Sequence, residues 1–149
     1  MTIELAWDVE VPTSLEGRAL VRAAQAALEH GGRAGIDLEL VVLSDTALAE
    51  LHGRYLGDDS PTDVMAFDLS DEHGGAQGEV YVSLDCARRV ASERGVDLER
   101  ELALYVVHGC LHLCGHDDHD DADRERMRAA ERAVMGSLGY PHDSAPHDR

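Results

Sequence analysis

The chain has 149 residues, which is enough for one domain with a hydrophobic core of its own. Hydrophobic residues make up 44% of it, yet no apolar run approaches the roughly 20 residues that a membrane-spanning helix needs. The formal net charge is −17 and all 13 basic residues are arginine, which argues against general affinity for nucleic acid. We therefore expect neither a membrane nor DNA as a partner.

The first residues carry early acids and no basic segment, so we expect no signal peptide and a cytoplasmic location. We expect a single domain over residues 1–140 and a flexible C-terminal tail over 141–149. No internal repeat or linker divides the chain.

The first half of the chain predicts alternating strands and helices. Apolar and polar residues alternate from Ile3 to Val11, as in a half-buried strand. Thr13 or Ser14 is expected to cap a helix that stops at Gly31. A second strand over 36–43 and a second helix capped by Ser44 or Asp45 are expected to follow.

The second half predicts two more strands and then helices. After a turn over 57–61, we expect strands over 62–69 and 79–83, separated by a glycine-rich loop over 71–78. Helices are expected over 84–94, from the cap Asp97 to the histidine motif, and over 120–138. The order predicts an α+β fold, with a small mixed four-stranded sheet covered by about five helices and a metal site at the end of a central helix.

The most informative segment covers residues 108–119 and reads His-Gly-Cys-Leu-His-Leu-Cys-Gly-His-Asp-Asp-His. His108 and His112 are four apart, so their side chains lie on one face of a helix. Gly115 can end that helix, after which His116, Asp118 or His119 could supply a third ligand. Three protein ligands with one open position for water define a catalytic metal site.

The spacing of this segment matches that of the metzincin peptidases, but one residue differs. Their general base is a glutamate directly after the first histidine, and this chain has Gly109 there. A metallopeptidase therefore remains an alternative function, although this chain lacks the glutamate that serves as general base in those enzymes.

The three cysteines are expected to be free thiols. Cys110 and Cys114 each lie two residues from a histidine of the motif, about 200° around the helix. They should face the core as small buried hydrophobes rather than bind zinc.

Three segments of the chain together resemble the YbeY family of metal-dependent endoribonucleases and rRNA maturation factors. Residues 60–67 read Ser-Pro-Thr-Asp-Val-Met-Ala-Phe, similar to the family's Pro-Thr-Asp-Val-Leu-Ser-Phe. Residues 78–83 read Gly-Glu-Val-Tyr-Val-Ser, similar to its Gly-Asp-Ile-x-Ile-Ser. The third segment is the histidine motif, and the resemblance covers almost the whole chain.

This resemblance implies one zinc ion per chain, held by His108, His112 and the residue at position 118. The family most often has histidine at that position, whereas this chain has Asp118, with His119 beside it as the alternative third ligand. The implied activity is single-strand-specific cleavage of RNA, in 16S rRNA 3′ end processing and ribosome quality control. The implied partners are ribosomal RNA, the small ribosomal subunit and its assembly proteins.

The chain also departs from the family near the Pro-Thr-Asp turn. Leu56 stands where the family typically has an arginine thought important for activity, and Arg54 is the candidate substitute. Asp117 could act as general base or could orient a ligand histidine. A third interpretation is a ribosome assembly factor without catalysis, whose zinc is structural.

Overall fold

The computed structural model describes residues 2–56, 63–70, 75–117 and 119–140. The predicted turn over 57–61 and the predicted tail over 141–149 lie outside the described residues, and so does Asp118. No helix in the described ranges is long and apolar enough to cross a membrane.

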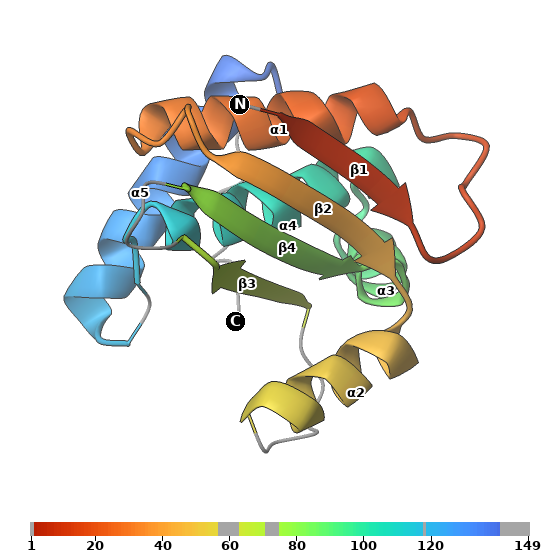
Figure 1. Cartoon of the computed structure of the whole chain (residues 1–149). Coiled ribbons are helices and arrows are strands. Elements are labelled where there is room, and N and C mark those ends of the chain that lie inside the picture. The colour runs from red at the N-terminus through yellow and green to blue at the C-terminus, as the bar shows by residue number, and fades with distance from the viewer. Residues whose placement is uncertain (1, 57–62, 71–74, 118, 141–149) are drawn as a thin grey trace.

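Four strands form one mixed sheet, as predicted (Figure 1). They are β1 (Ile3–Trp7), β2 (Asp37–Leu43), β3 (Val64–Asp68) and β4 (Gln77–Ser83). The sheet order is β1-β2-β4-β3, in which β1, β2 and β4 run parallel and β3 runs antiparallel to β4. Alternate residues of β2 and β4, such as Leu40 and Val80, enter the main core on one face of the sheet, whereas Val41, Met65 and Tyr81 lie in or against a smaller core on the other face.

The described residues form five helices, which are α1 (Gly17–His30), α2 (Asp45–Leu56), α3 (Leu84–Arg94), α4 (Leu98–Leu113) and α5 (Asp121–Ser137). Helices α1 and α4 pack against each other and against the sheet, and α5 packs against both of them. Leu48 of α2 forms a second, smaller core with Leu43 and Met65. The α+β prediction is therefore confirmed.

Two predicted boundaries near the N-terminus are wrong. Strand β1 ends at Trp7, because its pairing with β2 stops at Val42. Helix α1 begins at Gly17 instead of after Thr13 or Ser14, because the Leu15 amide donates to the Pro12 carbonyl in a separate turn. That turn buries Leu15 before the helix starts.

Local capping chemistry sets most other helix boundaries as predicted. The Ser44 and Ser83 hydroxyls accept hydrogen bonds from the amides of residues 47 and 86, and Asp120 accepts one from the amide of residue 123. Gly95 ends α3 with a φ of 68°. Asp97 precedes α4, but its side chain accepts no capping hydrogen bond among the described residues.

Helix α4 is the centre of the core, since nearly every residue from Arg100 to Leu113 is buried. It lies very close to the sheet at Gly109. A Cβ atom at that position would lie 2.7 Å from Val80 Cγ1 and 3.1 Å from Val64 Cγ2. Position 109 therefore faces strands β4 and β3, and glycine is what lets the helix approach them.

We predict that Gly109→Ala lowers the free energy of unfolding by about 1–3 kcal/mol, because the added methyl group overpacks the contact between α4 and the sheet. Urea unfolding measures this change. The control is Gly136→Ala on α5, where a Cβ atom would meet nothing within 4 Å. That control should stabilise the protein by about 0.4–1 kcal/mol, and equal effects of the two substitutions would contradict the close approach.

Candidate metal centre

The last two turns of α4 bring His108 and His112 together, as their spacing predicts. Their ring centroids are 4.7 Å apart and the ring planes differ by 77°. His108 is 5% exposed, whereas His112 is partly exposed. One imidazole is therefore held inside the protein and the other lies toward the surface.

A buried carboxylate on α5 fixes the ring of His108. Glu131 Oε2 lies 2.5 Å from His108 Nδ1, and Glu131 is only 4% exposed. An ionised carboxylate only accepts hydrogen bonds, so an ionised Glu131 selects the tautomer in which Nδ1–H donates the hydrogen bond. In that tautomer the lone pair of the ring is on Nε2, the nitrogen that would bind a metal.

The sequence analysis assigned no role to Glu131, although its position among apolar residues indicates that it is buried. The buried residues of α5 are Met127, Ala130, Glu131, Val134 and Met135. A glutamate on the apolar stripe of a helix needs a buried partner, because an unpaired buried charge is costly. That partner is His108.

A glycine turn ends α4 directly after the two histidines. Gly115 has a φ of 97°, its amide donates to the His112 carbonyl at 3.0 Å, and the His116 amide donates to the Leu111 carbonyl at 3.0 Å. This pair of bonds is the Schellman motif. The prediction that Gly115 ends the helix is confirmed, and the turn sets the direction of the residues that follow.

Two of the acidic and histidine side chains after the turn contact each other. His119 Nε2 lies 3.2 Å from Asp117 Oδ2, and the side chain of His119 is 82% exposed. The two roles expected for Asp117, general base or partner that orients a ligand histidine, stay predictions. Among the described residues, no group of three or more His, Cys, Asp or Glu side chains is arranged to hold a metal. The third ligand stays a prediction, since Asp118 lies outside those residues.

The donor chemistry of the two described histidines nevertheless fits zinc. Zinc binds neutral imidazole nitrogens at about 2.0–2.1 Å. The other ring nitrogen of such a histidine usually donates a hydrogen bond to a carboxylate, a carbonyl or water. His108 has that partner in Glu131, and the neighbouring ring of His112 is on the same helical face.

The structure does not bring Arg54 together with the histidines. Arg54 is exposed on the last turn of α2, a helix that packs against β3, β4 and α3. Figure 1 shows α2 apart from the connection between α4 and α5. A part for Arg54 in catalysis therefore stays a prediction.

The three cysteines are free thiols, as predicted. Cys110 is fully buried, and burial raises the pKa of its thiol well above the usual value. Cys114 packs against Gly31, where an added Cβ atom would lie 2.3 Å from the Cys114 sulfur. Both cysteines thus help to fill the core, away from the two histidines.

The described site is thus a pair of histidines at the end of a buried helix in an α+β fold, one of them held by a carboxylate. A sequence profile described as "Endoribonuclease YbeY" matches residues 6–139 of the chain. The chain therefore belongs to the YbeY family, as the three sequence segments indicated.

Individual relatives agree with this assignment. "Endoribonuclease YbeY" of Myxococcus xanthus is 38% identical over 136 residues, which cover 88% of this chain but only 46% of that longer protein. The protein of the same name from Pelotomaculum thermopropionicum is 38% identical over 138 residues, covering 87% of this chain and 90% of that protein. The solution structure of TM1509 from Thermotoga maritima matches with a TM-score of 0.57 and 26% identity, covering 99% of this chain and 100% of that one.

We predict that Glu131→Gln weakens zinc binding by about 10–100-fold, because the neutral amide no longer fixes the proton on His108 Nδ1. Competition of the purified protein with a chelating zinc indicator measures the affinity. Glu125→Gln is the matched control, since Glu125 is exposed on the same helix. Unchanged affinity in Glu131→Gln would show that the carboxylate does not orient a ligand.

Proposed function

We propose that this protein is a zinc-dependent endoribonuclease that cleaves single-stranded RNA. Membership of the YbeY family supports the activity, because the curated relatives are named endoribonucleases. We further propose that it acts in 16S rRNA 3′ end processing and ribosome quality control, with the small ribosomal subunit and its assembly proteins as partners.

The observation that carries the metal proposal is the hydrogen bond between His108 and Glu131. A buried histidine whose Nδ1 donates to a carboxylate presents Nε2 in a fixed direction, which is how metal-binding histidines are usually arranged. His112 adds a second imidazole one turn later. Asp118, or alternatively His119, would complete three ligands and leave one position open.

The residues around this centre have distinct proposed roles. A zinc ion held there would supply Lewis acidity, which would polarise a phosphoryl oxygen and lower the pKa of water toward neutrality. Glu131 would keep His108 in the tautomer that directs the lone pair of Nε2 to the metal. Asp117 accepts a proton from the attacking water or orients the neighbouring His119, and its contact with His119 favours the second role. Arg54 remains the candidate for binding the phosphate.

The packing of Gly109 argues against the metallopeptidase alternative. In the peptidases with this histidine spacing, the general base follows the first histidine directly. Here the Cβ position of residue 109 points at Val80 and Val64 of the sheet. A glutamate side chain at that position would collide with the sheet.

A second candidate function is a ribosome assembly factor with structural zinc. Leu56 in place of the family's arginine favours it, as does the net charge of −17, which gives no general attraction to RNA. Cleavage of RNA by the metal-loaded protein distinguishes the two functions.

We predict one equivalent of zinc in the purified protein, and cleavage of a single-stranded RNA that is lost in His112→Ala and after metal removal by a chelator. Elemental analysis measures the zinc content, and a gel assay measures the cleavage of RNA. His30→Ala is the control, because His30 is exposed at the end of α1. Zinc without cleavage would support the assembly factor, and cleavage that persists in His112→Ala would contradict the proposed centre.

We predict that Asp118→Ala abolishes stoichiometric zinc binding whereas His119→Ala retains it, because a carboxylate at position 118 is the proposed third ligand. Metal content after dialysis against a weak chelator measures the difference. The reverse pattern would assign His119 as the third ligand.

A further inference from the structure

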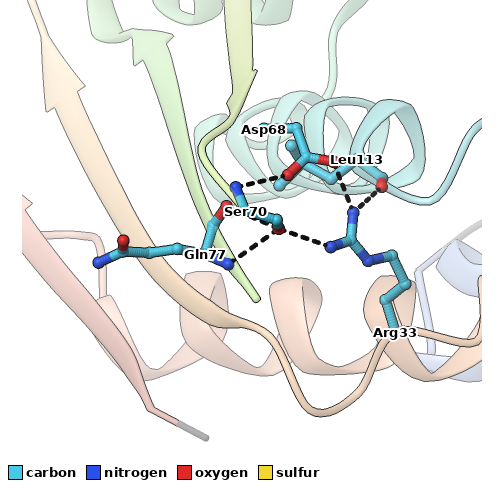
Figure 2. A network of polar contacts seen from close by, with 5 residues as sticks. All are labelled: Arg33, Asp68, Ser70, Gln77 and Leu113. Atoms are coloured by element: carbon cyan, nitrogen blue, oxygen red, sulfur yellow. Dashed lines mark hydrogen bonds and ion pairs between the residues drawn. The ribbon is translucent and has the colours of Figure 1, made fainter. Parts of the chain in front are cut away.

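Arg33 joins three parts of the chain next to the proposed metal centre (Figure 2). It lies in the connection between α1 and β2, and one guanidinium nitrogen donates to the Leu113 carbonyl at 2.7 Å and to Asp68 Oδ2 at 2.9 Å. The other donates to the Ser70 hydroxyl at 3.0 Å. The end of α4 is thereby tied to the end of β3.

The bond to Leu113 completes the hydrogen bonding at the end of α4. The last four carbonyls of a helix have no partner inside the helix. Backbone amides satisfy the other three, since Cys110, Leu111 and His112 accept from the amides of residues 114, 116 and 115. The Schellman turn provides no backbone donor for the Leu113 carbonyl, and the Arg33 guanidinium donates a hydrogen bond to it instead.

The surroundings hold Arg33 in this position. Asp68 is kept ionised because hydrogen bonds from Ser70, and then the charge of Arg33, lower the pKa of its carboxyl group. The side chain of Arg33 is only 27% exposed. Its positive charge also lies at the C-terminus of α4, where the helix dipole favours a cation.

We propose that Arg33 is a positioning residue for the metal centre. By binding the carbonyl directly after His112, it keeps the last turn of α4 from fraying and fixes the point at which the chain leaves the helix at Gly115. The two proposed ligand histidines then keep one relative geometry. This inference rests on the proposed metal centre and adds to it a residue 80 positions away in sequence from the carbonyl that it binds.

Cobalt titration of the full-length protein tests the proposal, because the visible absorption of Co²⁺ reports both its affinity and its coordination geometry. We expect Arg33→Met to weaken Co²⁺ binding by about 10-fold and to alter the absorption bands, at a temperature where unfolding measurements show the variant to be folded. Arg33→Lys keeps a cation but not the fork of donors, so it should recover part of the affinity.

A control separates positioning from general stabilisation. Arg89→Met removes another arginine that is paired with an aspartate, at 3.3 Å from Asp45, and should leave the spectrum unchanged.

The outcomes distinguish this inference from the function on which it rests. A wild-type protein that binds no Co²⁺ contradicts the proposed metal centre and the role of Arg33 with it. Wild-type affinity and spectrum in a folded Arg33→Met, even with a lower melting temperature, contradict the positioning role alone. If Arg33→Met does not fold, wild-type affinity and spectrum in Arg33→Lys contradict it.

Discussion

The close approach of α4 to the sheet at Gly109 is the constraint on which the rest of the site depends. With no side chain at that position, the helix lies against Val80 and Val64. Each residue turns the helix by roughly 100°, so the neighbouring His108 lies on a different side of the helix from Gly109, where it contacts α5. Glu131 meets it there, and His112 follows one turn later on the same face. The packing at Gly109 leaves no space for the glutamate of the peptidases and places the paired histidines on the part of the helix that contacts α5.

Both sides of the histidine pair are held by groups distant in sequence. Glu131 fixes the ring of His108 from α5, and Arg33 binds the last carbonyl of α4 from the connection before β2. These two contacts restrain His108 and the last turn of α4. The net charge of −17 gives the chain no long-range attraction to RNA, so the proposed activity depends on short-range contacts at this centre and on its proposed ribosomal partners.

Local patterns predicted the fold class, the mixed sheet and most helix ends, because serine caps and glycine turns act within a few residues. The paired histidines and the turn at Gly115 were predictable for the same reason. The start of α1 was not, because the turn that buries Leu15 competes with the cap. Glu131 was detectable only as a charge on an apolar stripe, and the Arg33 contact with Leu113 has no local pattern at all.

The most direct test of the account is the tautomer of His108, measured by nitrogen-15 NMR of the histidine rings before and after zinc is added. We expect the proton on Nδ1 in both states and a large shift of the Nε2 resonance of His108 and of one nitrogen of His112 with one equivalent of zinc. A His108 ring that carries its proton on Nε2, or that does not respond to zinc, would contradict the claim that Glu131 prepares this histidine to bind a metal.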